Sequence, residues 1–280
     1  MNALEIRDLT KTYTGFQLDG LNLILPEGCI LGLVGENGAG KSTTIKLILD
    51  MIERDKGTIF ILGRDNKENL KLTKNDIGVV LDEVGLPECL NPKQIGNVMK
   101  YTFNNWQQEV YDDYLAKWAI PENKRFKDFS KGMKMKLGIA IALSHNPKLL
   151  ILDEATSGLD PVVRDEVIDI LYDFTREETH SILISSHIVS DLEKLCDYIA
   201  FLHKGKLMLC EEKDVLLEQY GIIQCTKEQL EELEPSAIKG KKVSSYGVEA
   251  IVRRDEIPKG FSVIPISIEE LFIFMVKGDF

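Results

Sequence analysis

A glycine-rich segment at residues 35–43 combines the residue types that bind a nucleoside triphosphate. It lies between an apolar run and a helical pattern. Glycines let main-chain N–H groups approach phosphates closely, and the N-terminus of the following helix adds partial positive charge. The Lys41 ammonium can reach the β- and γ-phosphates, and the Ser42 hydroxyl can bind Mg²⁺. The predicted contacts of ATP are Gly35, Glu36, Asn37, Gly38, Ala39, Gly40, Lys41, Ser42 and Thr43.

Two adjacent carboxylates, Asp153 and Glu154, follow an apolar run at residues 149–152. In an open parallel sheet, ligands lie at the carboxyl ends of the strands, so both side chains are expected beside the glycine-rich segment. Asp153 is placed to hold magnesium, directly or through water, and Glu154 to orient and deprotonate an attacking water. A charged pair that only starts a loop is the alternative. The glycine-rich segment weighs against that alternative, and the two segments together predict ATP hydrolysis.

Two further positions are candidates for phosphate contact, although each is ambiguous by itself. His187 follows a predicted buried strand at residues 182–184, where a side chain could touch the γ-phosphate, but a single histidine is more often structural. Ser130 and Gly132 precede a predicted helix, and a helix N-terminus can hold an anion. Serine is also the commonest helix N-cap. These residues are therefore site candidates only because of their positions relative to the glycine-rich segment and the two adjacent carboxylates.

Short apolar strands alternate with amphipathic helices along most of the chain. Strands are predicted at residues 4–6, 17–25, 29–34, 58–62, 77–81, 149–152 and 182–184, and helices are predicted to start near residues 41, 91, 132 and 160. Strands that are apolar on both faces, separated by helices, indicate an α/β fold with a parallel sheet. The strands at 4–6, 17–25 and 58–62 are expected to form an antiparallel layer at its edge.

The pattern changes after about residue 211, where the charge density rises. We predict an ATPase domain at residues 1–213, with a helical subdomain at about 86–145, and a small α+β accessory segment at 214–280. Within that segment, a strand-turn-strand is predicted at residues 243–253. Ser267 and Glu270 have the spacing of a capping box before the last helix.

Charge and cysteine content argue against several classes of protein. The formal net charge is −11, whereas nucleic-acid binders usually present a broad basic face. The short basic clusters at residues 131–136 and 239–242 are interpreted as solvated faces. No apolar run approaches the roughly 18 residues of a membrane helix, and the N-terminus does not read as a secretory signal. The five scattered cysteines are typical of reduced thiols in a cytosolic protein.

In order and spacing, these segments resemble the nucleotide-binding subunit of ABC transporters over about residues 1–215. Residues 35–43 are similar to that family's Walker A segment and residues 149–154 to its Walker B segment. Residues 157–160 resemble the D-loop, and His187 resembles the switch histidine. The resemblance implies the P-loop NTPase fold of ABC-type ATPases, with ATP and Mg²⁺ as cofactors.

The resemblance also covers adenine binding and assembly. Tyr13 falls where the family stacks an aromatic ring on adenine, and residues 130–134 lie at its signature, which usually reads Leu-Ser-Gly-Gly-Gln. Two such domains are then expected to pair head to tail, as a homodimer or with a second ATPase subunit. Ser130 and Gly132 would contact a γ-phosphate held by the other subunit. The family further implies a separate transmembrane permease and attachment to the inner face of the cell membrane. No nucleic acid is expected as a partner, because the net charge is acidic.

Three positions depart from the family pattern. Lys131 replaces the first glycine of the signature, which resembles the bacterial subgroup that exports drugs, antibiotics or peptides. Ala155 stands where proline is usual, and we expect a small effect. Asp82 occupies the Q-loop position that glutamine normally holds. Its carboxylate could hold a magnesium-bound water while adding negative charge beside the phosphates; a loop carboxylate facing solvent is the alternative.

Two other functions fit part of the pattern. A soluble ABC-type ATPase acting on nucleic acid or ribosomes usually has a long coiled coil before its signature, or two ATPase domains. Here about 90 residues without heptads separate Lys41 from Ser130. A small-molecule kinase would share only the glycine-rich segment. The aromatic residues at 90–118 lie where the family contacts its permease, but most are interpreted as core.

Overall fold

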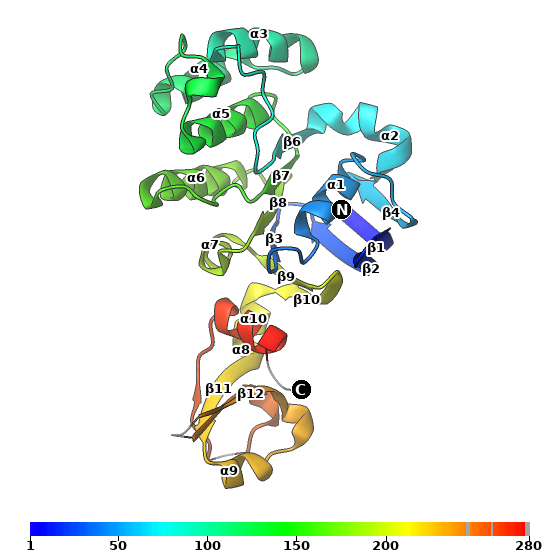
Figure 1. Ribbon diagram of the computed structural model, residues 1–280, viewed down its shortest axis with the longest axis vertical. Helices are drawn as coiled ribbons and strands as arrows, with labels where there is room; N and C mark the ends of the chain where they lie inside the picture. Colours follow the sequence, from blue (N-terminus) through cyan, green and yellow to red (C-terminus); the bar gives the residue numbers. More distant parts are fainter. Residues whose placement is uncertain (245–246, 259, 278–280) are drawn as a thin grey trace.

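A six-stranded sheet forms the centre of the molecule (Figure 1). The computed structural model describes residues 1–244, 247–258 and 260–277. The strand order is β10-β9-β3-β8-β7-β6, and neighbouring strands are parallel except β9 and β10. The strands are β3 (Ile30–Val34), β6 (Ile77–Val80), β7 (Leu149–Asp153), β8 (Ser181–Ser186), β9 (Tyr198–His203) and β10 (Lys206–Glu212). The predicted parallel sheet of an α/β fold is confirmed.

Each face of the central sheet is covered by a different layer. One layer is an antiparallel sheet of order β2-β1-β4-β5 together with α1, and the other consists of α5, α6 and α7. The first layer comprises β1 (Asn2–Tyr13), β2 (Phe16–Pro26), β4 (Lys56–Ile61), β5 (Arg64–Asp65) and α1 (Lys41–Ile48). The second comprises α5 (Lys131–Leu143), α6 (Pro161–Phe174) and α7 (Val189–Leu195). The predicted antiparallel edge layer is confirmed.

Strand β7 shows why the central strands read as continuous apolar runs. Leu149 and Ile151 pack toward the antiparallel layer, whereas Leu150 and Leu152 pack toward the helices. Because a strand points successive side chains to opposite faces, a strand covered on both sides needs apolar residues at every position. Only the last residue, Asp153, is polar, and it stands at the edge where the functional loops begin.

A group of helices lies between β6 and β7, in the region where the sequence predicts a helical subdomain. Its elements are α3 (Pro92–Thr102), α4 (Gln108–Lys117), η2 (Phe126–Asp128) and α5, while α2 (Asn66–Thr73) and η1 (Lys74–Asp76) precede β6. Asn91 caps α3 as predicted, because its side chain accepts from the Gln94 main-chain N–H at 2.9 Å. Most aromatic residues of this segment pack on its core, as interpreted from the sequence. Tyr111 is fully buried, whereas Tyr101 is 91% exposed.

A small sheet of order β12-β13-β11-β14 forms much of the C-terminal segment. Its elements are α8 (Lys213–Gln219), β11 (Tyr220–Cys225), α9 (Lys227–Glu231), η3 (Pro235–Ala237), β12 (Ile238–Ser244), β13 (Gly247–Arg253), η4 (Arg254–Glu256), β14 (Val263–Ile264) and α10 (Ile268–Lys277). The strand-turn-strand predicted at 243–253 corresponds to the end of β12 and to β13, which pair antiparallel; β12 begins earlier than predicted, at Ile238, and residues 245–246 lie outside the described residues. The capping box is also confirmed: the Ser267 hydroxyl accepts from the Glu270 main-chain N–H at 3.1 Å, and the Glu270 carboxylate accepts from the Ser267 main-chain N–H at 2.9 Å.

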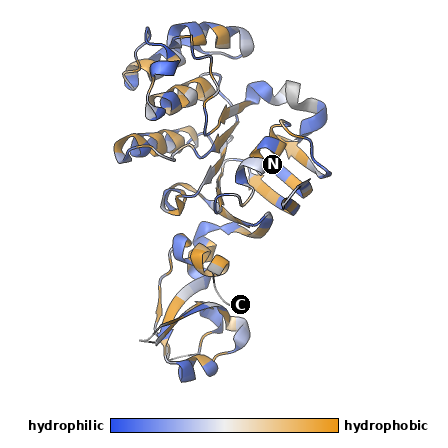
Figure 2. Cartoon of the chain, in the orientation of Figure 1, coloured by the Kyte–Doolittle hydropathy of each residue, from blue (hydrophilic) through white to orange (hydrophobic). Residues whose placement is uncertain are grey.

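The last helix, α10, packs against the core on the helical side of the central sheet and is mostly apolar (Figure 2). The ring centroid of Phe272 lies 5.2 Å from that of Phe201 in β9. The main-chain N–H of Ile268 donates to the carboxylate of Glu193 in α7 at 3.1 Å. Residues after the predicted boundary at 213/214 thus share a core with residues before it. The division into domains 1–213 and 214–280 stays a prediction.

The helices are short. The longest described helix, α6, has 14 residues. Over the part of the chain that the structure describes, none has both the length and the apolar character needed to cross a membrane.

Candidate active site

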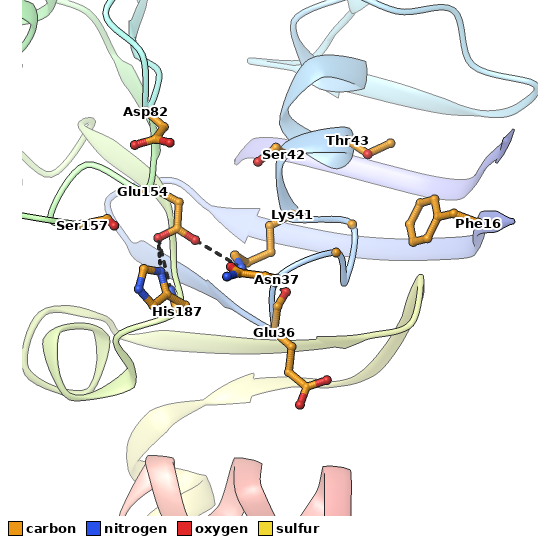
Figure 3. A pocket seen from close by; sticks show the side chains of 12 residues that line it. Phe16, Glu36, Asn37, Lys41, Ser42, Thr43, Asp82, Glu154, Ser157 and His187 are labelled. Atoms are coloured by element: carbon orange, nitrogen blue, oxygen red, sulfur yellow. Dashed lines mark hydrogen bonds and ion pairs between the residues drawn. The ribbon is translucent and has the colours of Figure 1, made fainter. Parts of the chain in front are cut away.

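A cavity of about 590 Å³ lies where the loops at the carboxyl ends of β3, β6, β7 and β8 meet (Figure 3). The glycine-rich loop after β3 and the first turn of α1 contribute one group of side chains, and the loops after β6, β7 and β8 contribute the other. The lining residues are Phe16, Glu36, Asn37, Gly38, Gly40, Lys41, Ser42, Thr43, Asp82, Glu154, Ser157 and His187. Segments far apart in the sequence converge here because the strands are parallel and their carboxyl ends share one edge.

Two positions of the loop require glycine for different reasons. A Cβ at Gly35 would lie 2.5 Å from the main-chain oxygen of Leu202, and Gly40 has a φ of 115°, which side chains rarely tolerate. The loop folds back on Lys41, whose Nζ donates to the carbonyl of Gly35 at 2.7 Å and to that of Glu36 at 3.3 Å. The ammonium is therefore fixed at the N-terminus of α1, where the helix dipole adds to its positive charge.

Glu154 contacts both of the other residues predicted to be catalytic. Its carboxylate lies 3.2 Å from Lys41 Nζ and 2.6 Å from His187 Nδ1 (Figure 3). The backbone of Glu154 has a φ of 53°, in the left-handed region, and its N–H donates to the carbonyl of Ser185 at 3.1 Å. Such strained conformations persist where the surroundings hold them, commonly at functional sites. Here the sharp turn after β7 places the carboxylate in the cavity.

The three predicted magnesium ligands lie at two depths. Ser42 and Asp82 line the cavity. Asp153 is 5% exposed, and its Oδ1 accepts a hydrogen bond from Ser185 Oγ at 2.6 Å. Among the described residues, no group of three or more His, Cys, Asp and Glu side chains could hold a metal ion. A hydroxyl and two carboxylates still fit Mg²⁺, since this ion prefers oxygen ligands and usually completes its shell with water and substrate phosphates.

An aromatic residue that sequence reasoning missed, Phe16, lines the cavity. Its ring lies against Gly40, where an added Cβ would be 3.0 Å from Phe16 Cζ. Tyr13, predicted to stack on adenine, is not among the lining residues. It is 43% exposed, and Lys11 Nζ lies 5.5 Å from its ring centroid. Tyr13 and Phe16 pair across the β1–β2 turn, so the sequence offered two aromatic candidates at one hairpin, and the role of Tyr13 stays a prediction.

Ser130 and Gly132 line a separate depression of the surface. Ser130 is the N-cap of α5, because its hydroxyl accepts from the Met133 main-chain N–H at 3.3 Å. Within one chain, the structure does not bring these residues to the main cavity. Any phosphate that Ser130 and Gly132 contact would therefore be bound to a second chain. Ser157, from the segment that resembles the D-loop, also lines the main cavity and is not among the predicted site residues.

Comparison with known proteins finds relatives along almost the whole chain. The family model described as ABC transporter matches residues 18–157. The chain is 30% identical to the ABC transporter ATP-binding protein YtrB of Bacillus subtilis (strain 168), covering 98% of each protein. It is 37% identical to the lantibiotic transport ATP-binding protein SrtF of Streptococcus pyogenes, covering 75% of this chain and 91% of SrtF. A solved structure of the ATP-binding subunit of an ABC transporter matches with a TM-score of 0.71 at 27% identity, covering 78% and 92% of the two chains.

Proposed function

Given that this chain belongs to the ABC transporter family and is an ATP-binding subunit with ATPase activity, we propose that it hydrolyses Mg-ATP in the cavity between Lys41 and Glu154. The free energy of this hydrolysis drives a separate membrane permease that exports a peptide antibiotic or a drug. The observation that supports the site is the contact of the Glu154 carboxylate with both Lys41 Nζ and His187 Nδ1, at 3.2 and 2.6 Å. A base is thus held between a cation and an imidazole at one edge of the sheet.

The three contacting side chains have distinct roles in this proposal. Lys41 and the main-chain N–H groups of the glycine-rich loop bind the β- and γ-phosphates. Glu154 accepts a proton from the attacking water. His187 orients the Glu154 carboxylate and reaches the γ-phosphate. Because Glu154 contacts both neighbours, it is held in place on either side.

The magnesium site completes the proposed chemistry. Ser42, Asp153 and Asp82 would hold the ion, directly or through water. Bound Mg²⁺ supplies neutralisation of the negative charge on the phosphate oxygens. The hydrogen bond from Ser185 to Asp153 orients that carboxylate, as partners behind a metal ligand commonly do. Phe16, whose ring lies against Gly40, is a further candidate to contact the adenine ring of ATP, together with Tyr13.

Two assembly contacts belong to the proposal. Ser130 and Gly132 contact the nucleotide of a second ATPase subunit, so a head-to-tail dimer forms on ATP binding and opens after hydrolysis. The permease binds the helical subdomain and holds the chain at the cytoplasmic face of the membrane. Val98 and Tyr101 of α3, which are 48% and 91% exposed, offer an apolar contact for it. Exposed apolar side chains grouped on one helix commonly mark such interfaces.

The cargo is inferred from similarity. SrtF is named for the transport of a lantibiotic, a peptide antibiotic, and it is 37% identical to this chain. The signature with Lys131 also resembles that of bacterial exporters of drugs, antibiotics or peptides. A peptide antibiotic is therefore the cargo that we propose to test first.

Purification of the chain from gently solubilised native membranes tests the assembly. We expect a polytopic membrane protein to co-purify in near-equal amounts; recovery of ribosomes or DNA-repair proteins instead would contradict the transport function. Lantibiotic resistance and ATP turnover are then compared between cells that express that permease with the parent chain and cells that express it with a variant chain. Lys41→Ala is expected to abolish both. Lys46→Ala, on the exposed face of the same helix α1, serves as the matched control and is expected to leave both unchanged.

A further inference from the structure

The two charged departures from the family pattern contact each other in the folded chain. Asp82 follows strand β6, and Lys131 is the first residue of helix α5. The Nζ of Lys131 lies 3.1 Å from Oδ1 of Asp82. An acid in place of the usual glutamine and a lysine in place of the usual glycine thus form one ion pair, although 49 positions separate them.

The ion pair lies at the boundary of the nucleotide cavity. Asp82 lines that cavity together with Ser42 and Glu154 (Figure 3). It also lines an adjoining cavity of about 510 Å³, to which Lys131 contributes. Asp82 therefore faces the proposed phosphate site on one side and Lys131 on the other.

A second contact fixes the direction of the lysine side chain. Lys131 lies over Gly158, where an added Cβ would be 3.3 Å from Nζ, 3.6 Å from Cδ and 3.7 Å from Cε. The lysine stem thus crosses the segment that resembles the D-loop before its ammonium reaches Asp82. One side chain connects the loop after β6, the start of α5 and the loop before α6.

The charges of the cavity explain why this contact matters. Glu36, Asp82 and Glu154 contribute carboxylates to it, whereas Lys41 is the one lysine or arginine among the described lining residues. Lys41 already pairs with Glu154. Without Lys131, the Asp82 carboxylate would face triphosphate oxygens with its charge uncompensated, and like charges at short range repel.

We propose that Lys131 is a positioning residue for ATP hydrolysis. It neutralises the charge of Asp82 and holds its carboxylate at the cavity edge, so that this carboxylate can hold a magnesium-bound water without repelling the phosphates. This proposal rests on the proposed function of the cavity. Both side chains are about half exposed, at 49% and 51%, so the pair contributes little to folding. Its effect is expected in nucleotide binding.

A double-mutant cycle with Lys131→Met and Asp82→Asn tests the proposal. The Kd of Mg²⁺ with a non-hydrolysable ATP analogue is measured by calorimetry on the full chain at concentrations where it is monomeric, and KM and kcat are measured with ATP. Lys131→Met is expected to raise Kd and KM by roughly three- to tenfold, the size for one partly hydrated charge, with a much smaller change in kcat. In the Asp82→Asn background, the same Lys131→Met change is expected to alter Kd and KM by less than about twofold, whatever the effect of Asp82→Asn alone. Lys127→Met removes an exposed lysine just before the same helix and is expected to change neither.

The outcomes separate this inference from the proposed function. An unchanged Kd in Lys131→Met, or an equal loss with and without Asp82→Asn, would overturn the pairing role and assign Lys131 to another contact, such as the phosphate of a second subunit. Lys41→Ala is measured in parallel. If Lys41→Ala loses binding while the cycle shows no coupling, only the inference about Lys131 fails; if Lys41→Ala binds normally, the proposed nucleotide site itself fails.

Discussion

Replacement of Glu154 by glutamine tests the proposed base with little change of shape. Glutamine keeps an oxygen that can accept from Lys41 Nζ, 3.2 Å from the native carboxylate, and an amide that can donate to His187 Nδ1, 2.6 Å from it. It removes the negative charge and the ability to take a proton from water. The side chain is 12% exposed, so solvent has limited access to replace the lost group.

The expected loss follows from the role of a base. Removal of a general base slows a reaction by about 10²- to 10⁴-fold, which corresponds to about 2.7–5.4 kcal/mol of transition-state stabilisation. Binding of ATP is expected to stay equal or become tighter, because one carboxylate fewer faces the phosphates in a largely buried site. The predicted pattern for Glu154→Gln is therefore a large fall in kcat without a rise in the Kd for ATP.

Three measurements check this pattern: steady-state phosphate release, calorimetric titration with Mg-ATP, and size-exclusion chromatography in saturating ATP. We expect the variant to accumulate as an ATP-bound dimer, because closure no longer leads to hydrolysis. Glu177→Gln, an exposed position beyond the C-terminal end of α6, is the control for loss of one carboxylate. A kcat above one tenth of the parent value, or a parallel loss of ATP binding, would refute the assignment of Glu154 as the base.

Two further predictions concern stability. Phe272→Ala is expected to lower the free energy of unfolding by about 3–5 kcal/mol, because Phe272 is 9% exposed and packs on Phe201. Urea denaturation measures this change. Ile273→Ala, on the exposed side of α10, is the control, and an equal effect of both changes would argue against the packing. Burial lowers the pKa of His145 below its ordinary value of 6.5, so the stability from its neutral form is present above that value and lost as pH falls through the folded-state pKa. The stability advantage of the parent over His145→Gln is therefore expected to shrink between about pH 8 and pH 5, and a difference independent of pH would contradict it.

Much of the candidate site could be predicted because its chemistry is local in the sequence. Lys41 follows a strand and a glycine turn within a few residues, so its position at a helix N-terminus needs no tertiary information. Glu154 follows an apolar strand, and the rule that parallel strands present their carboxyl ends at one edge places it opposite Lys41. The helix caps at Asn91 and Ser267 were equally predictable, since each hydrogen bond spans three residues.

Contacts that depend on distant packing could not be predicted. Phe16 lines the cavity because the register of the β1–β2 hairpin turns its ring toward Gly40, and sequence spacing alone did not distinguish it from Tyr13. The pairing of Asp82 with Lys131 requires helix α5 to pack beside β6. Each residue was recognised as unusual separately, but neither spacing nor periodicity carries the information that the two charges meet.

The C-terminal helix shows the same limit at the level of domains. Leu271 and Phe272 of this helix are buried, but the apolar residues of a helix do not by themselves indicate which surface covers them. The change of composition after residue 211 suggested a separate unit, and β11, β12 and β13 do have a core of their own. Because α10 contacts α7 and β9 as well as β12, it fixes the accessory segment to α7, the helix that begins two residues after His187. Its attachment is therefore a property of the central sheet as much as of the segment itself.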